Sequence, residues 1–355
     1  MIDERGNLSI DFLIGFTVFM LAFIWVASMV SGIMVGLQSS HIDYDAVAYR
    51  TGVILVEDPG WPASPPWEFY GDDQKYEISR FGLAMSKNTP GILSQDKVNR
   101  FFCSSFIYPD DYHSRAIFGD YPYHFNISVL DGESVKGQSA GDVLPDGYGY
   151  IRRLVKIKEG SNATIGTALI NKFHLNNTEN VTTHDFSVLI DNTKLQGNMR
   201  NPVYQIDTVR EQIIINITDL RSTIKEFNPD IDHPLGIDRD TSIITLQSIA
   251  VKKLEGGVLS TVRSYDRPYI DGKSTVTAPP CGVNDNVSLI INPRVFDIMQ
   301  SGYAKIYINY TFTVLPDSTF LNNTNARAQP FDYNYFKENV TQPRLRDAVV
   351  EVAVW

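Results

Sequence analysis

The chain contains very little cysteine, with only Cys103 and Cys281 among its 355 residues. Neither belongs to a C-x-x-C pair, and neither lies in a cluster of cysteines and histidines, which excludes the common zinc and thiol-redox motifs. In a reducing compartment we expect two buried thiols. In an oxidising compartment, a single disulfide between Cys103 and Cys281 is the open alternative.

Runs of positive charge are also lacking. The formal net charge is −10 and the sequence pI is about 5.1, which argues against a nucleic-acid partner. The six histidines are scattered without an H-E-x-x-H pattern, and the chain has no G-x-S-x-G motif, phosphate-binding glycine loop or dinucleotide fingerprint. The sequence therefore predicts a protein that is not an enzyme and has no metal and no cofactor.

A long apolar run lies near the N-terminus. Residues 12–37 form 26 consecutive positions without a charge. As a helix this run measures about 39 Å, enough to cross a hydrocarbon core of about 30 Å, and it is too long for the apolar part of a cleaved secretory signal. Arg5 is the only basic residue before it, which favours an N-terminus inside the cell and a large domain outside.

The helical pattern continues beyond the apolar run to Val56, and Pro59 and Gly60 then end it. We expect a helix of up to about 50 residues that bends either at 38–40 or at Gly52. One face of the apolar part carries Ser28, Gly32 and Gly36, a spacing of small residues that lets another helix approach closely.

The residues around the start of this helix form a motif. Arg5 and Gly6 end a short charged leader, and the sequence then runs Asn7, Leu, Ser, Ile, Asp11, Phe, Leu. This arrangement resembles the archaeal type IV pilin-like proteins with a class III signal peptide, whose motif reads Q-x-S-x-E-F-L after a glycine. Asn7 replaces the usual glutamine and Asp11 the usual glutamate, and both replacements keep the chemical class.

The resemblance implies cleavage between Gly6 and Asn7 by a prepilin peptidase. It also implies that Asp11 pairs with the free N-terminal amine of a neighbouring subunit. The domains would then be a leader at 1–6, a pilin-like helix at 7–57 and an outer domain at 58–355. The implied partners are other pilin-like subunits, the pilus assembly machinery and membrane lipid.

The length of the chain favours a minor or specialised filament subunit over a bulk pilin, with an outer domain for adhesion or assembly. The alternative is a permanently anchored cell-envelope or receptor protein with an extracellular binding domain. In that alternative Asp11 only marks the membrane boundary and Gly6 is a coincidence.

After residue 60 the sequence changes to short segments of alternating polarity, which predict strands. The fold class is therefore α+β: a long N-terminal hydrophobic helix followed by a β-rich, antiparallel, sandwich-like extracellular domain, with short helices near 220–227 and 292–302 and a subdivision near 197–202. The eight clearest strand segments are 123–130, 150–158, 185–191, 211–218, 242–254, 286–291, 305–314 and 347–355.

Nine N-x-S/T sequons follow the apolar run, more than this composition predicts by chance. They are potential glycosylation sites if the chain is exported. Those that lie within predicted strands are expected to point away from the apolar face of the sheet. The nine asparagines are Asn126, Asn162, Asn176, Asn180, Asn216, Asn286, Asn309, Asn322 and Asn339.

Aromatic residues are frequent, with 18 Tyr and 19 Phe. Most of them are expected in the core, but two aromatic-rich segments, 61–70 and 106–123, are candidate binding loops for sugars or proteins.

Overall fold

The computed structural model describes most of the chain. The described residues are 10–39, 43–119, 121–132, 137–166, 183–197, 201–220, 243–262, 268–271, 273–274, 279–293, 305–315, 330–335, 337 and 339–355. They form an N-terminal helix followed by mostly β structure, so the predicted α+β class is confirmed.

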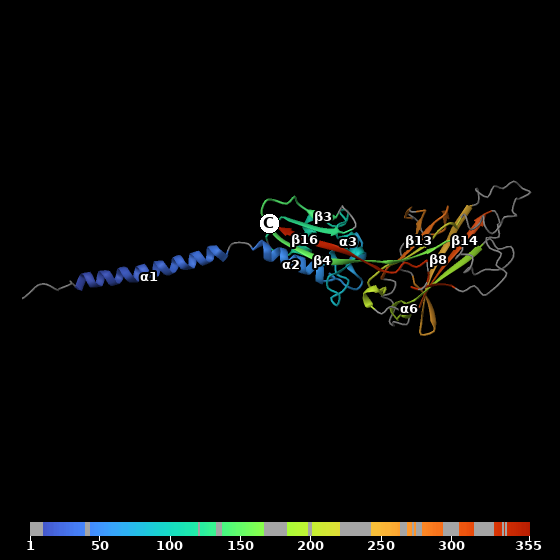
Figure 1. Ribbon diagram of the computed structural model, residues 1–355, viewed down its shortest axis with the longest axis horizontal. Helices are drawn as coiled ribbons and strands as arrows, with labels where there is room; N and C mark the ends of the chain where they lie inside the picture. Colours follow the sequence, from blue (N-terminus) through green and yellow to red (C-terminus); the bar gives the residue numbers. More distant parts are fainter. Residues whose placement is uncertain are drawn as a thin grey trace, which may run out of the picture.

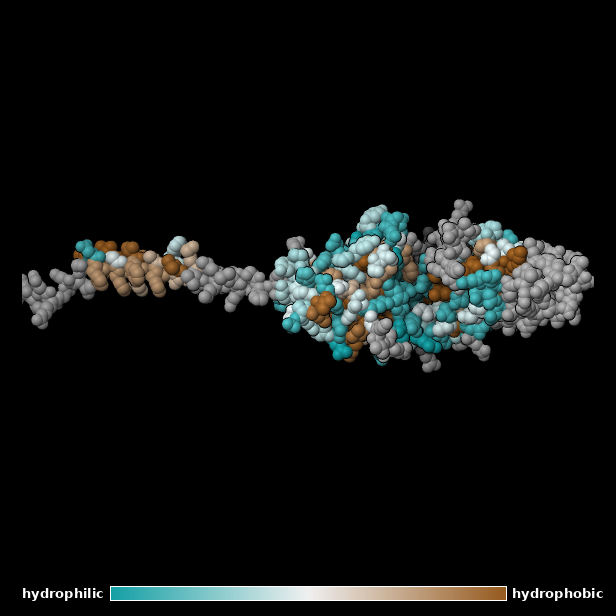
Figure 2. Space-filling view, turned by 90° about the horizontal axis from the view of Figure 1, so that it is seen from above, coloured by the Kyte–Doolittle hydropathy of each residue, from teal (hydrophilic) through white to brown (hydrophobic). Residues whose placement is uncertain are grey.

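The N-terminal helix α1 (Ile10–Ser39) contains a stretch, Ile10–Met29, that is long and apolar enough to cross a membrane. None of that stretch is buried against the rest of the chain. In Figure 1, α1 projects away from the folded part of the molecule, and Figure 2 shows its hydrophobic surface in brown. A helix that is apolar all round and has no protein covering it requires a lipid or helical environment.

The predicted 50-residue helix is two helices in the structure. The second, α2 (Tyr44–Glu57), starts at the N-cap Asp43, whose side chain accepts a hydrogen bond from the amide of Ala46 at 3.1 Å. The interruption lies next to the predicted bend at 38–40. Gly52 is not a bend: a Cβ there would lie 2.8 Å from Cγ2 of Ile151, so the glycine lets α2 approach a sheet closely.

We call the part next to α1 the proximal body. Its five-stranded sheet has the order β1-β4-β16-β2-β3, with β1 parallel to β4 and the other pairs antiparallel. Helix α2 packs on β4 and β16, and short helices cover the same core. The strands are β1 (Ile92–Ser94), β2 (Phe125–Asp131), β3 (Gln138–Gly141), β4 (Gly149–Glu159) and β16 (Arg344–Val354). The short helices are η1 (Trp67–Phe69), η2 (Asp72–Glu77), α3 (Gln95–Phe101), α4 (Pro109–Tyr112) and η3 (His113–Ile117).

The remaining residues form the distal body, which contains two sheets. Their orders are β11-β10-β13-β7-β5 and β12-β8-β14-β6-β15, with β9 paired to β8, and buried residues of both sheets form one hydrophobic cluster. The first sheet consists of β5 (Ser161–Ile165), β7 (Ile213–Ile217), β10 (Tyr269–Ile270), β11 (Lys273–Ser274) and β13 (Val287–Ile291). The second consists of β6 (Thr183–Asp191), β8 (Ile243–Glu255), β9 (Val258–Val262), β12 (Cys281–Val283), β14 (Lys305–Leu315) and β15 (Phe331–Tyr333). The short helices α6 (Asn192–Gly197) and η4 (Pro202–Tyr204) follow β6.

The distal body is inserted into the proximal sheet. The chain leaves the proximal body after β4, forms the distal body, and returns as β16, which lies between β4 and β2 in the proximal sheet. Figure 1 shows the two bodies one beyond the other along the long axis. The two cores therefore separate near 159–161 and 341–344, whereas the predicted subdivision near 197–202 falls within the distal body.

All eight predicted strand segments are strands in the structure. The sequence did not indicate the short strands that pair in parallel: β1 with β4, β5 with β7, and β15 with β6. Most residues of the two predicted short helices near 220–227 and 292–302 lie outside the described residues.

Candidate functional site

Helix α1 carries the predicted subunit-contact residues. Asp11 lies in its first turn, is exposed, and is the only charged residue of the helix. The Ser28 hydroxyl donates to the carbonyl of Trp25 at 2.7 Å, so this polar group is satisfied within the helix and can enter lipid or a helix interface. Gly32 and Gly36 also lie in α1, whereas the leader residues Arg5, Gly6 and Asn7 lie outside the described residues.

Six of the nine sequon asparagines belong to the described residues, and none of the six is buried. The three predicted to lie within strands alternate with buried neighbours as expected: Asn126 lies between Phe125 and Ile127, and Asn216 and Asn309 have equivalent positions in β7 and β14. Asn162, Asn286 and Asn339 are partly or fully exposed. Asn176, Asn180 and Asn322 lie outside the described residues.

Some of these asparagines make local hydrogen bonds. The amide of Asn126 donates to the carbonyl of Asp142 at 2.8 Å, and the side-chain oxygen of Asn162 accepts from the Thr341 hydroxyl at 3.0 Å. These contacts orient the side chains at the surface, and they leave each asparagine at least partly accessible.

The two cysteines are free in the structure. Cys103 packs against the proximal core, with its sulfur 3.1 Å from the Ser105 hydroxyl, whereas Cys281 packs against the distal core. The disulfide that the sequence left open is therefore not formed, because the two thiols belong to different bodies.

The junction between the bodies is built around Lys158, the second-last residue of β4. Its side chain is buried and donates to the carbonyl of Gln205 at 2.7 Å and to the carboxylate of Glu211. A second link joins α3 to the distal body, since the amide of Gln212 donates to Asp96 at 2.9 Å. These contacts attach the distal body to the proximal one beyond the two chain crossings.

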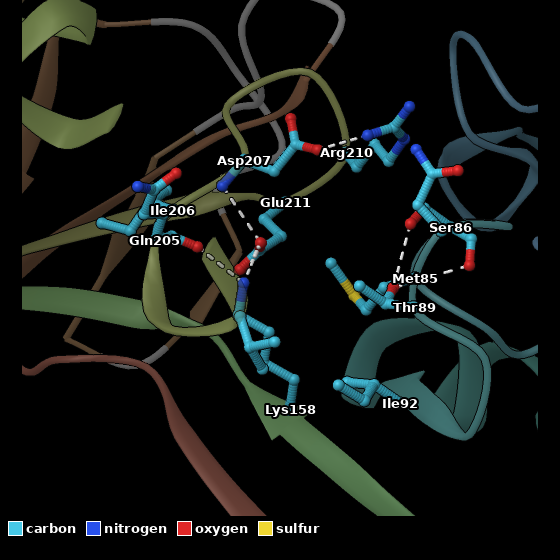
Figure 3. Close-up of a pocket in the computed structure, with 12 residues that line it drawn as sticks. Met85, Ser86, Thr89, Ile92, Lys158, Gln205, Ile206, Asp207, Arg210 and Glu211 are labelled. Carbon is cyan, nitrogen blue, oxygen red and sulfur yellow. Dashed lines mark hydrogen bonds and ion pairs between the residues drawn. The ribbon is translucent and has the colours of Figure 1, made fainter. Parts of the chain in front are cut away.

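A cavity of about 420 Å³ lies beside this junction. The proximal body contributes the segment from Met85 to Ile92, and the distal body contributes the segment from Val203 to Glu211. Figure 3 shows Lys158 paired with Glu211 at one side and Arg210 paired with Asp207 at another. The charged groups of the lining are thus paired with one another, and the remaining polar groups include hydroxyls and amides that can bond a small polar molecule.

The charge state at the junction depends on burial. Desolvation raises the pKa of Glu211 to about 7, although the neighbouring Lys158 ammonium and its hydrogen bond act in the opposite direction. Each partner of the buried Lys158–Glu211 contact makes a further hydrogen bond, from Lys158 to the carbonyl of Gln205 and from the amide of Asp207 to Glu211, which helps such a pair to offset desolvation.

The two aromatic-rich segments are divided between core and surface. Trp67, Phe106 and Tyr112 are fully or nearly fully buried, as expected for most aromatics. Trp61 and Tyr108 remain exposed. Among the described residues, no group of three or more His, Cys, Asp or Glu side chains is placed to hold a metal ion.

Comparison with known proteins identifies no family. No family model matches the chain, and no solved structure matches it. An uncharacterized protein of Archaeoglobus fulgidus is 38% identical over 60 residues, which cover 17% of this chain and 31% of that protein. The matched part thus spans less than a third of the relative's length.

Proposed function

We propose that the protein is a pilin-like surface protein, a minor or specialised subunit of an archaeal type IV pilus-like filament. The observation that carries the proposal is α1, a 30-residue helix that is apolar on all sides, projects from the folded bodies and has a single carboxylate, Asp11, in its first turn. The protein that matches 60 residues of this chain is archaeal, which is consistent with the archaeal origin implied by the signal-peptide motif.

The role of Asp11 follows from electrostatics. At the centre of a membrane helix a carboxylate costs roughly 2.5–3.5 kcal/mol on insertion scales, so burial of Asp11 among assembled helices would call for a compensating cation. Cleavage between Gly6 and Asn7 would create a positive amine, and the amine of a neighbouring subunit is a suitable partner for Asp11 when helices assemble. The small residues Ser28 and Gly32 would let those helices approach closely.

In this proposal the N-terminus lies inside the cell, and the proximal and distal bodies lie outside. The distal body would be the predicted sandwich, a proposal supported by the single hydrophobic cluster that residues of its two sheets form, and its accessible sequon asparagines such as Asn309 and Asn216 would bear sugar. The cavity between the bodies offers a place for contact with an adhesion target or an assembly factor.

The test is the N-terminal sequence of the mature chain isolated from membranes, compared with that of the Gly6→Val variant. The proposal expects a chain that begins at Asn7 and an uncleaved variant. A chain that begins at Met1 or Ile2 would reject the proposal and favour the permanently anchored envelope or receptor protein. Asp11→Ala, which leaves the cleavage site intact, should be processed normally but fail to enter filaments.

A further inference from the structure

One end of the proximal body is unusually rich in exposed apolar and aromatic side chains. Val143 is 92% exposed and Leu144 is 45% exposed in the segment that follows β3. Tyr121, Tyr148 and Tyr150 are exposed around them. We call these five residues the apolar end.

Hydrogen bonds hold the segments of the apolar end together. The amide of Tyr150 donates to the carboxylate of Asp45 in the first turn of α2 at 3.1 Å. The amide of Asp142 donates to the carbonyl of Phe125 at 2.8 Å, and the His124 ring lies 2.8 Å from the Asp142 carboxylate. The exposed Val143 therefore directly follows an anchored residue.

The C-terminus of the chain lies at the same end. The amide of Trp355 donates to the carbonyl of His124 at 3.0 Å, and the two rings stack at 6.0 Å. Tyr44, at the start of α2, makes an edge contact with Tyr123, which in turn packs on Tyr121. The start of α2, the C-terminus and the apolar end thus form one surface.

This surface lies next to the end of the apolar helix. Ser39 ends α1 and Tyr44 begins α2, so five backbone steps of about 3.6 Å at most separate them, about 18 Å in all. Figure 1 shows α1 leaving the proximal body at the end where α2 begins and the C-terminus lies. If α1 spans a bilayer, this short connection holds the apolar end on the side of the bilayer where α1 ends and within reach of its surface.

We propose that the apolar end rests on the surface of the bilayer that α1 spans, with Val143 and Leu144 in the headgroup region and the tyrosines around them. Tyrosine and tryptophan are enriched at membrane–water interfaces because they combine an apolar ring with a polar atom. The acidic residues Asp45 and Asp142 at this end argue against attraction to anionic lipid as the driving force, so we expect the contact to depend on apolar burial. The proposal rests on the membrane-spanning role of α1, which the pilin-like and the permanently anchored proteins share.

The experiment uses the full chain in phosphatidylcholine vesicles with nitroxide labels on single cysteines, in a Cys103→Ser/Cys281→Ser background. Val143→Cys is compared with Val258→Cys, a 67% exposed valine of the distal body that serves as a matched control. Ala22→Cys reports whether α1 is inserted. Collision rates with oxygen, which concentrates in lipid, and with a water-soluble nickel complex are measured for each label.

The expected result is a several-fold higher oxygen-to-nickel collision ratio at Val143 than at Val258, unchanged by added salt or by anionic lipid. Equal ratios at the two valines would overturn the proposal even if Ala22 is in lipid, and this outcome would leave the pilin-like function standing. A label at Val143 that neither reagent reaches would indicate a protein contact instead and would also overturn it. A water-exposed label at Ala22 would reject both the bilayer contact and the anchoring by α1.

A second measurement needs no substitution. Tyr148 is 38% exposed and Tyr76 is 78% exposed, so from exposure alone Tyr148 should be oxidised by hydroxyl radicals at about half the rate of Tyr76. If the bilayer covers Tyr148, its oxidation rate in the unmodified chain in the same vesicles should be several-fold lower than that. Oxidation rates in proportion to those fractions would contradict the proposal.

Discussion

The buried cores of the two bodies are built from different kinds of structure. In the distal body, alternating residues of strands such as β7, β8 and β14 fill the space between two sheets. In the proximal body one sheet face is covered by α2 and by the irregular segment 58–119, which contains only short helices and the three-residue strand β1. A sheet satisfies its own backbone groups, but an irregular segment packed on a core does not.

The proximal body satisfies some of those groups with cationic side chains. Lys97 is 2% exposed, and its ammonium donates to the carbonyls of Pro59 at 2.6 Å and Ala84 at 2.9 Å. Arg115 and Arg100 also donate to backbone carbonyls of this segment. The comparison teaches that a core covered by an irregular segment draws donors for some of its backbone carbonyls from cationic side chains, whereas paired strands supply those donors from the backbone.

The largest expected effect is the loss of Lys97. Lys97→Met keeps an apolar stem but leaves two buried carbonyls without a donor and the nearby buried Glu68 carboxyl without a cation. We expect the free energy of unfolding to fall by about 3–5 kcal/mol, as for other broken buried charge contacts. Denaturant unfolding of the full chain in a nonionic detergent measures it.

The matched control is Lys156→Met, since the Lys156 side chain is 53% exposed and pairs with the exposed Asp347. Surface pairs of this kind contribute about 1 kcal/mol or less. Similar losses for the two variants would contradict the role given to carbonyl satisfaction in the proximal body.

The next effect concerns the junction between the bodies. Lys158→Met leaves the buried Glu211 without its cation, and we expect a loss of about 3 kcal/mol. Replacement of both partners, Lys158→Met with Glu211→Leu, should recover most of that loss because no unpaired charge remains. A double variant no more stable than the single variant would mean that the hydrogen bonds to Gln205 and Asp207 matter more than the charge pair.

A smaller effect should depend on pH. Glu68 is 6% exposed, neither of its carboxylate oxygens has a hydrogen-bond partner among the described residues, and desolvation raises its pKa from 4.5 to about 7. A carboxyl with a raised pKa stabilises the fold at low pH, and this contribution is lost as the pH rises from about 4.5 through 7. Glu68→Gln removes the titrating group. The free energy of unfolding of this variant, relative to that of the wild type, should therefore increase as the pH rises, by up to about 3 kcal/mol at pH 8. Melting curves at pH 5 and pH 8 measure the difference, and an equal difference at both pH values would rule the effect out.

The same comparison explains which parts of the fold the sequence predicts. The strands of the distal body, such as β7 and β14, have a period of two that reveals both the strand and its buried face. The packing of 58–119 depends on contacts such as that of Lys97 with Pro59, 38 residues apart, and no local pattern encodes them. The insertion of the distal body between β4 and β16 likewise depends on a long-range strand pairing, which no local pattern encodes.

The candidate sites were predictable to a similar degree. Asp11 and the sequon asparagines can be found from local motifs, and the surface positions of Asn126, Asn216 and Asn309 follow from strand alternation. The Lys158–Glu211 junction brings together residues 53 positions apart, and neither residue carries a motif. Val143 and Leu144 were missed because a short apolar pair after a strand resembles any strand end, and only its exposure in the folded structure makes it distinctive.

The smallest predicted effect comes from the distal core. Tyr310 is completely buried in β14, and its hydroxyl has no hydrogen-bond partner among the described residues. By contrast, the hydroxyl of the equally buried Tyr333 lies 2.7 Å from that of Ser161. Tyr310→Phe removes an unpaired polar atom and should leave stability unchanged or raise it by about 1 kcal/mol, whereas Tyr333→Phe breaks a bond and should lower it by about 1 kcal/mol. The denaturant midpoints of the two variants, compared with that of the wild type, measure these changes. A Tyr310→Phe variant less stable than the wild type would mean that a water molecule or another group bonds this hydroxyl within the sheet-built core.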